Sequence, residues 1–217
     1  MIKAVIFDMD GLVADTEHLQ SKAFTVVLKE YGHAAVPDEF GIVHTVGIGA
    51  FDNWKRLAEK HGLAEDVDKL VLRRRAVYLS LLKENLKPMP GLLKLLKRLK
   101  ANGFTLALAS SSAKDSVDLV LSRVNIRHFF DAVVSGDQVK HIKPFPDLDL
   151  EAARRLNVLP VECVVLEDSK TGVVAAKRAG MKVIAVPNAL TKGQDFAEAD
   201  LVVDSLEKID EKLVAAI

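Results

Sequence analysis

The sequence predicts an α/β fold, in which a Rossmann-like parallel sheet is covered by helices on both faces to give three layers. From residue 88 onward, short apolar runs alternate with amphipathic stretches of about ten residues, which is typical of a parallel sheet with right-handed crossovers. Between residues 15 and 87 no convincing strand pattern appears. We therefore expect a core built from residues 1–14 and 88–217, and a helical cap, residues 15–87, inserted after the first strand.

The first strand is expected at residues 4–7, an apolar run too short for a helix. The cap is expected to begin with a helix whose apolar residues recur every fourth position from Leu19 to Tyr31, with Asp15 or Thr16 as its N-cap and Gly32 as its end. Residues 33–49 are expected to form a short helix with loops. Two longer helices are expected at residues 51–60 and 67–82.

The second half of the chain supplies the rest of the core. Pro88, Pro90 and Gly91 separate it from the cap, and four leucines then line one face of a helix over residues 92–99 that Gly103 ends. The expected strands are residues 104–109, 132–134, 163–166, 182–186 and 201–203. The expected helices are residues 114–124, 147–157, 171–179 and 206–216.

Composition narrows the possible functions. The chain has 217 residues, of which 49% are hydrophobic, so it can bury a sizeable core. Thirty basic and thirty acidic residues cancel, so we expect no nucleic-acid partner and no anionic membrane surface. The single cysteine, Cys163, lies in an apolar run and is expected to be reduced and buried. Without a signal peptide or a span of roughly 20 apolar residues, the protein is expected to be soluble and cytoplasmic.

Two aspartates follow the first strand, in the stretch KAVIFDMDGLVAD. If the strand direction continues through Met9, Asp8 and Asp10 point to the same side, beyond the carboxyl end of the strand. Two close carboxylates repel, so that one of them holds a proton or both share a cation. Asp8 is then a candidate nucleophile or metal ligand, and Asp10 a candidate general acid and base. The alternative is a solvated acidic loop beside the turn residue Gly11.

Other strands also end in polar residues, and in a parallel sheet those ends share one edge. The strand over residues 104–109 runs into Ser110, Ser111 and Ser112, which could hold an anion or act only as turn and N-cap residues. Glu167 and Asp168 bring further acids, and carboxylates without His or Cys favour a hard cation such as Mg²⁺ over zinc. Between them lies Lys143, before Pro144, which could point into the site or lie at the surface.

Taken in their order along the chain, these polar segments resemble the motifs of the haloacid dehalogenase-like hydrolase superfamily, which consists mostly of Mg²⁺-dependent phosphatases. The insertion point of the cap resembles the subfamily of β-phosphoglucomutase and sugar-phosphate phosphatases. The four motifs are DMDG, Ser110, Lys143-Pro144 and Glu167-Asp168-Ser169.

The resemblance implies a role for each motif residue. Asp8 attacks phosphorus and forms an aspartyl-phosphate, and Asp10 protonates the leaving oxygen and then deprotonates water. Mg²⁺ is bound by Asp8, by Asp168 and by the backbone carbonyl of Asp10. Glu167 is either a further metal ligand or supports the ligands without contacting the metal. The phosphoryl oxygens are held by Ser110 and Lys143, with Ser111 and Gly11 as further phosphate-binding residues.

The resemblance also ranks the possible reactions. An acid two residues after the nucleophile disfavours dehalogenation. Gln20 stands where mutase-like sequences carry a histidine, and Ala50 where they carry an arginine, which favours a phosphatase for a small phosphomonoester, such as a sugar or polyol phosphate, over a phosphomutase. A non-catalytic binding protein is the third alternative. The sequence does not decide the oligomeric state, and a monomer is favoured.

Several cap residues have two possible roles. One residue of the run Arg73, Arg74 and Arg75, with Arg74 preferred, could contact an anionic substrate, or the run is a solvated helix face. Trp54 and Phe51 are expected in the cap core, with a substrate-lining role as the alternative. The roles of Glu17 and His18 stay open, with His18 facing either the cap or solvent.

Overall fold

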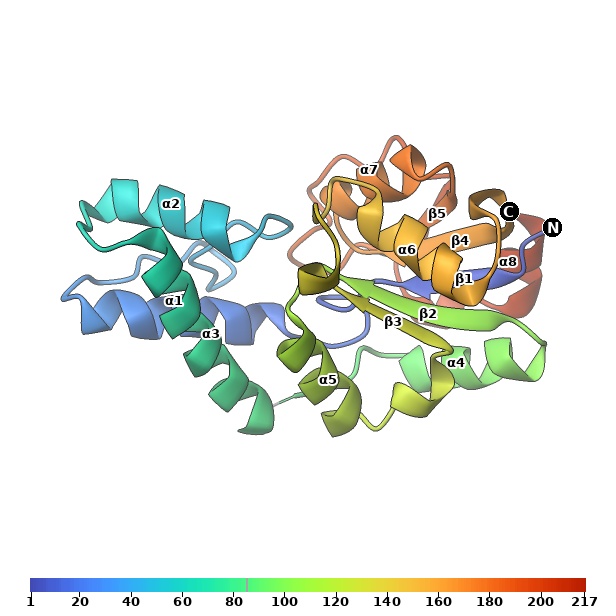
Figure 1. Ribbon diagram of the computed structural model, residues 1–217, viewed down its shortest axis with the longest axis horizontal. Coiled ribbons are helices and arrows are strands. Elements are labelled where there is room, and N and C mark those ends of the chain that lie inside the picture. Colours follow the sequence, from blue (N-terminus) through green and yellow to red (C-terminus); the bar gives the residue numbers. More distant parts are fainter. Residues whose placement is uncertain (85) are drawn as a thin grey trace.

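A computed structural model describes residues 1–84 and 86–217 of the chain. Within those residues, six parallel strands form one sheet in the order β3-β2-β1-β4-β5-β6, which confirms the predicted α/β class (Figure 1). β1 therefore lies between β2 and β4. The strands are β1 (Ala4–Phe7), β2 (Thr105–Ser110), β3 (Ala132–Ser135), β4 (Cys163–Glu167), β5 (Lys182–Ala185) and β6 (Leu201–Val202).

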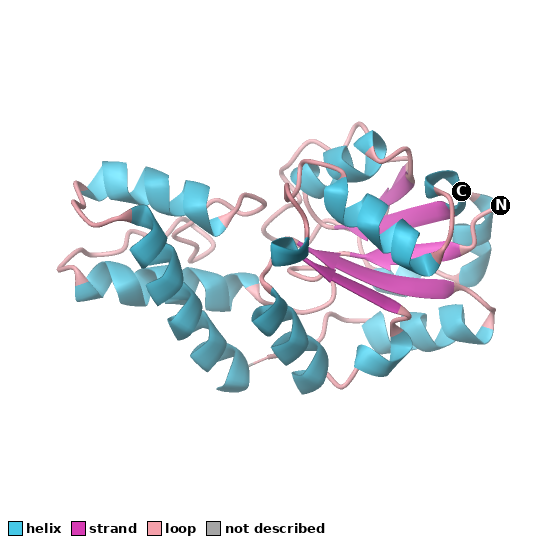
Figure 2. Cartoon of the chain, viewed as in Figure 1, coloured by secondary structure: helices cyan, strands magenta, loops and turns pink. Residues whose placement is uncertain are grey.

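Helices cover both faces of the sheet, as Figure 2 shows. Alternate residues of a strand point to opposite faces, so Val5 and Phe7 of β1 belong to one buried cluster and Ala4 and Ile6 to another. The first cluster is closed by α4 (Leu92–Ala101), α5 (Lys114–Arg123) and α8 (Glu211–Ala216), and the second by α6 (Asp147–Leu156) and α7 (Lys170–Arg178). The predicted three layers are confirmed.

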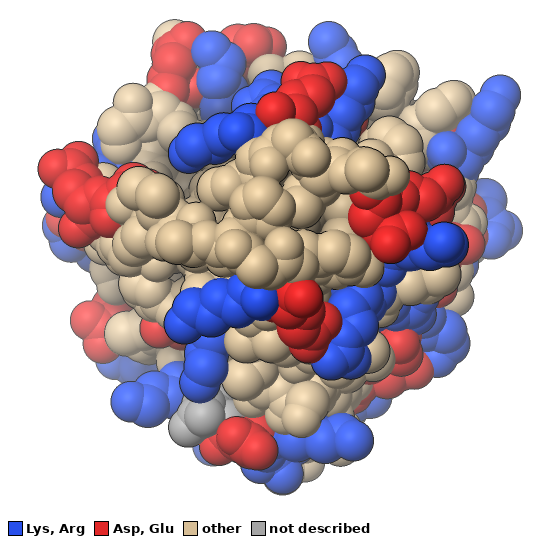
Figure 3. Space-filling view, turned by 90° about the vertical axis from the view of Figure 1, so that its left-hand side faces the viewer, with Lys and Arg blue, Asp and Glu red and all other residues tan. Residues whose placement is uncertain are grey.

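The helical section consists of α1 (Glu17–Glu30), α2 (Ala50–His61) and α3 (Val67–Glu84), with a buried cluster of its own around Phe24, Trp54 and Leu70. It lies on the side of the sheet to which the strands' carboxyl ends point (Figure 1). On the face that it presents in Figure 3, basic and acidic side chains are interspersed around an uncharged band.

Two predicted helices differ from the structure. Residues 33–49 form loops and turns without the expected short helix. The Asp38 carboxylate there accepts the backbone N–H groups of Phe40 and Ile42 at 2.9 and 2.8 Å, a local arrangement that competes with helix formation. The helix expected at 206–216 is divided into η4 (Leu206–Lys208) and α8, because Asp210 accepts the N–H of Leu213 and starts a new helix.

Two aromatic residues of α2 have different environments. Trp54 is fully buried, as predicted for the cap core, whereas Phe51 is 50% exposed, so the prediction for Phe51 is wrong. Three residues of an α-helix turn through about 300°, so Phe51 lies about 60° around the helix from Trp54. The Phe51 side chain therefore lies outside the face of α2 that packs on α1 and α3.

Two further expectations concern single features of the chain. Cys163 is a free, buried thiol, as predicted, and burial raises its pKa to about 12. Over the residues that the structure describes, no helix is both long and apolar enough to cross a bilayer.

Candidate active site

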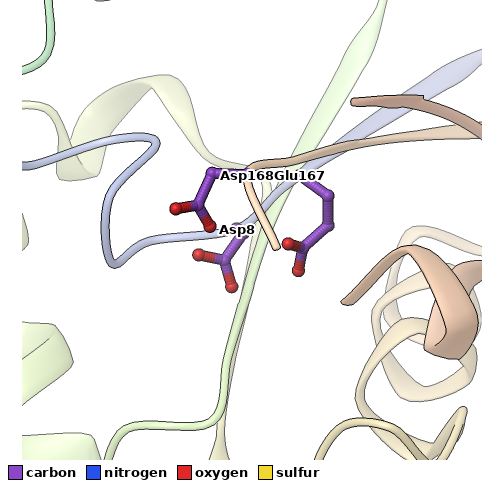
Figure 4. Close-up of side chains that lie close together, drawn as sticks. All are labelled: Asp8, Glu167 and Asp168. Atoms are coloured by element: carbon purple, nitrogen blue, oxygen red, sulfur yellow. The ribbon is translucent and has the colours of Figure 1, made fainter. Parts of the chain in front are cut away.

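Three carboxylates meet at the carboxyl edge of the sheet. Asp8 follows β1, Glu167 ends β4 and Asp168 follows it, and β1 and β4 are neighbours in register. One oxygen of each residue lies within 4.8 Å of one oxygen of each of the others, and Figure 4 shows the three side chains turned toward one another. The chain leaves β1 toward β2 and β3 and later returns to β4 on the other side, so the site lies where the strand order reverses.

Lys143 lies inside this cluster, buried, with its ammonium bridging two of the acids. Its Nζ donates to Asp8 Oδ1 and Glu167 Oε1, each at 2.6 Å, and to the carbonyl oxygen of Ala109 at 3.0 Å. Burial alone lowers the pKa of Lys143, but the carboxylates of Asp8 and Glu167 outweigh it and raise that pKa well above its usual value. The lysine is therefore charged, and it is already placed beside the candidate nucleophile.

The Glu167 carboxylate has hydrogen bonds to both oxygens. Oε1 accepts from Lys143, and Oε2 accepts the backbone N–H and the hydroxyl of Ser169, both at 3.1 Å. A Cβ on Gly172 would come within 1.8 Å of the Glu167 carboxylate, so only glycine fits at that point of α7. These contacts suit Glu167 to holding the Lys143 ammonium in position.

Asp8 and Asp168 offer the remaining oxygens to a cation. No hydrogen bond reaches Asp8 Oδ2 or Asp168 Oδ1 from the described part of the chain. Burial is the main cause that raises the pKa of both carboxyls well above their usual value, and Glu167 adds to it. When ionised, these buried carboxylates repel one another, and a divalent cation between them would offset that repulsion. An all-oxygen donor set suits Mg²⁺. The residues present therefore fit the predicted ion.

The Asp10 carboxylate accepts hydrogen bonds from hydroxyl and amide groups, some on the sheet side of the site and some on the side of the helical section. The hydroxyl of Thr16, the N-cap residue of α1, donates to Asp10 Oδ1 at 2.6 Å instead of capping the helix. The other donors to Asp10 are Gln20 Nε2 at 3.1 Å, Tyr78 OH at 3.3 Å, Ser112 Oγ at 2.8 Å and Ser110 Oγ at 3.4 Å.

The serines after β2 and the glycine after Asp10 have distinct positions. Ser110 is the last residue of β2, is buried, and accepts the backbone N–H of Ser112 at 3.1 Å, while Ser111 lines the cavity. Gly11 has a φ of +81°, and a Cβ there would lie 2.4 Å from Asp168 Oδ2. Its N–H donates to the carbonyl of Ala14 at 2.9 Å, so phosphate binding by this N–H requires that bond to open.

A cavity of about 280 Å³ lies between the sheet edge and the helical section. Thr171 of α7 donates its hydroxyl to the carbonyl of Gly47 at 2.7 Å on one side of it, and Arg75 of α3 donates to Asp115 of α5 at 3.0 and 3.1 Å on another. The segments that follow the strands contribute Asp8, Asp10, Ser111, Lys143 and Asp168 to its lining, and the helical section contributes Glu17, Gln20, His44, Ala50, Arg74 and Tyr78.

The three consecutive arginines of α3 have three different environments. Arg73 is exposed and pairs with Glu30 of α1, at 2.6 and 2.8 Å. Arg75 is the partner of Asp115. Arg74 is buried, and its guanidinium carbon lies 4.8 Å from the ring centroids of both Phe24 and Tyr78. The interpretation of the whole run as a solvated face therefore fails at Arg74.

A buried polar pair from the helical section forms part of the cavity wall. Glu17 Oε2 and His44 Nε2 are 2.9 Å apart, and Phe24 stacks on the His44 ring with centroids separated by 5.1 Å. His18, next to Glu17, is exposed, so of the two positions left open for it the structure shows the one in solvent. The burial of His44 could not be predicted from the sequence, because a histidine in a loop without periodicity carries no signal of burial.

The chain is similar to known proteins along most of its length. The sequence profile of the family described as haloacid dehalogenase-like hydrolase matches residues 5–186. The chain is 36% identical to the phosphorylated carbohydrates phosphatase of Thermotoga maritima, over 93% of each chain, and 32% identical to hexitol phosphatase B of Escherichia coli, over 97% and 96%. The crystal structure of β-phosphoglucomutase from Clostridium difficile, 28% identical, superposes with a TM-score of 0.84 over 100% of this chain and 96% of that one.

Proposed function

The chain belongs to the haloacid dehalogenase-like hydrolase family, and we propose that it is a Mg²⁺-dependent phosphatase of that family acting on a small sugar or polyol phosphate. The observation that carries the proposal is the position of Asp8. Its carboxylate lies 2.6 Å from Lys143 Nζ, beside Asp168, at the floor of the cavity. A carboxylate with a fixed cation beside it is arranged to attack a phosphoryl group.

The proposed mechanism has two steps at Asp8. An Asp8 oxygen attacks phosphorus as the bond to the leaving oxygen breaks, and Asp10 protonates that oxygen, which leaves an aspartyl-phosphate. Asp10 then takes a proton from water, whose oxygen attacks phosphorus and releases phosphate and free Asp8. Lys143 and Ser110 hold the phosphoryl oxygens. Mg²⁺, held by Asp8, Asp168 and the carbonyl of Asp10, would offset the negative charge of the phosphoryl group.

We propose that residues 15–87 act as the cap that closes this site and contacts the part of the substrate beyond the phosphate. Gln20 supports hydrolysis over phosphoryl transfer to a sugar, because its amide is engaged by Asp10 at 3.1 Å and by Arg74 at 2.6 Å. Ala50, at the start of α2, has no group to hold a second phosphate. Sugar and polyol phosphates are supported by the names of the relatives.

Phosphate release from a panel of sugar, polyol, nucleotide and glycolytic phosphates tests the proposal. We expect sugar or polyol phosphates to be hydrolysed fastest. Activity should disappear with a chelator and return when Mg²⁺ is added, because the buried acids repel the substrate dianion without a cation. A panel without any turnover in Mg²⁺ would contradict the proposal and favour a binding protein on the same fold.

The phosphomutase alternative is favoured by the likeness to the β-phosphoglucomutase structure. It predicts conversion of a hexose 1-phosphate to the 6-phosphate, stimulated by a bisphosphate. ³¹P NMR of the same reaction mixtures distinguishes the two reactions. Accumulation of the 6-phosphate with little free phosphate would replace hydrolysis as the main activity.

Arg74 is proposed to contact the substrate beyond its phosphate. Its guanidinium is buried, lines the cavity and donates to Gln20, while its Nε has no partner among the described residues. We expect Arg74→Ala to lower kcat/KM by about 10- to 100-fold, the usual effect of losing a hydrogen bond from a charged group. Steady-state kinetics on the best substrate of the panel measures this change.

Arg73→Ala is the matched control, because Arg73 is the preceding residue of α3 and pairs with Glu30 on the exposed side. It should leave kcat/KM within about twofold and change stability little, because an exposed ion pair contributes little to folding. Equal losses in the two variants, or a normal kcat/KM in a folded Arg74→Ala protein, would exclude Arg74 as a substrate contact.

A further inference from the structure

Asn188 joins two segments of the site that are far apart in the chain. It lies in the loop after β5, and its side-chain Nδ2 donates to Asp168 Oδ2 at 2.7 Å and to the carbonyl oxygen of Gly11 at 3.2 Å. Asp168 follows β4, and Gly11 lies in the loop after β1. One amide therefore connects the ends of three neighbouring strands at the carboxyl edge of the sheet.

The orientation of this amide is fixed by its own loop. Asn188 Oδ1 accepts the backbone N–H of Leu190 at 2.8 Å, and the N–H of Asn188 donates to the hydroxyl of Thr191, a buried side chain, at 3.0 Å. Because the oxygen is used by the turn, the NH₂ group must face Asp168 and Gly11. Neither acceptor could pair with the oxygen if the amide were rotated.

The hydrogen bond from Asn188 restricts the Asp168 carboxylate to one orientation. Oδ2 is held by Asn188, and a Cβ on Gly11 would lie 2.4 Å from that oxygen and 2.8 Å from Asn188 Nδ2, so the three groups are packed without spare room. No described residue donates to Oδ1, which leaves that oxygen available to a cation. Hydrogen bonds of this kind, made by a residue that does not itself touch the ion, orient carboxylate ligands and tune their affinity for a metal.

We propose that Asn188 is a positioning residue for the divalent cation: it fixes Asp168 as a ligand and ties the β1–α1 loop, with Gly11, to that ligand. This inference rests on the proposed function, because it assumes that the cation binds at Asp8 and Asp168. It adds a residue from a fifth segment of the core to a site that the four motifs had assigned to the DMDG stretch, Ser110, Lys143 and residues 167–169.

Asn188→Ser tests the proposal while keeping the local turn. A serine hydroxyl can still accept the N–H two residues on, but it is too short to bridge to Asp168 and Gly11. We expect isothermal titration of chelator-treated full-length protein with MgCl₂ to give a Kd about 10- to 100-fold weaker than that of the parent. Turnover should recover at correspondingly higher Mg²⁺, with KM for the substrate little changed.

Gln194→Ala is the matched control. Gln194 is an amide of the same β5–β6 connection, whose Oε1 accepts the N–H of Lys170 at 2.7 Å, and no hydrogen bond joins it to Asp168. Its Kd for Mg²⁺ should stay within about twofold of the parent value. If Asn188→Ser does not fold, Asn188→Thr keeps the same turn and takes its place.

The outcomes separate this inference from the proposed function. A parent protein that binds no Mg²⁺ would overturn both, because there would be no ion to position. A parent that binds Mg²⁺, together with a folded serine variant of equal Kd, would overturn the role of Asn188 alone. A lower Tm with unchanged Mg²⁺ affinity would likewise assign Asn188 to stability and not to the metal site.

Discussion

Asp8→Asn is expected to lower phosphate release by at least about 10⁴-fold and to leave the fold intact, as is usual when a nucleophile is removed. An amide oxygen cannot form the aspartyl-phosphate, so the first chemical step is lost. The variant still offers an oxygen to Lys143, whose Nζ lies 2.6 Å from Asp8 Oδ1. It also removes one of the buried like charges around Asp168, so stability without metal should be equal or higher.

The measurement is phosphate release by the parent and the variant with the best substrate of the panel, at saturating Mg²⁺. Circular dichroism and thermal unfolding show whether the variant is folded. Asp204→Asn, the same substitution at an exposed residue that pairs with Lys208, is the control and should keep parental activity. Turnover of Asp8→Asn close to that of the parent would exclude Asp8 as the nucleophile.

The assembly of the core site follows from local patterns and one topological rule. Apolar runs and helical periodicity predict which segments are strands, and a parallel sheet brings their carboxyl ends to one edge. Asp8 and Asp168 directly follow β1 and β4, and Ser110 ends β2, so their convergence was predictable from the sequence. The position of Lys143 was less directly predictable, since it lies in the connection between β3 and α6.

Contacts made by loops and by the helical section were not predictable in the same way. Periodicity places a residue on a face of its own helix but does not say which other segment meets that face. The bond between Arg74 and Gln20 and the pair of Glu17 with His44 depend on how α1, α3 and the 33–49 loop pack. Asn188 had one usable signal, because it follows the carboxyl end of β5 as the other site residues follow their strands.

Asp149 could also have been recognised from the sequence. It stands three and four residues before Ala152 and Ala153, which lie on the face of α6 that packs on the sheet, so helical spacing places it on the buried side. The structure buries it fully, and neither carboxylate oxygen has a hydrogen-bond partner among the residues described. An acid in such a place is expected to make stability depend on pH.

Burial raises the pKa of Asp149 from 3.8 to about 7, with Glu167 adding to the rise and Lys143 opposing it. The folded protein therefore holds a proton that the unfolded chain releases between about pH 4 and pH 7. The free energy of unfolding should fall as the pH rises through this range. A difference of about three pKa units corresponds to a loss of at most about 4 kcal/mol above pH 7.

Asp149→Asn removes the titrating group and should make stability less dependent on pH. Near pH 4.5 both side chains are largely neutral in the folded state, so we expect similar stabilities, whereas at pH 8 the variant should be more stable by about 2 to 4 kcal/mol. Urea denaturation at the two pH values measures the difference. The half-buried Asp147 of the same helix provides the control, Asp147→Asn, which should follow the parent. If Asp149→Asn and the parent lose the same free energy between the two pH values, the buried carboxyl of Asp149 does not titrate in this range.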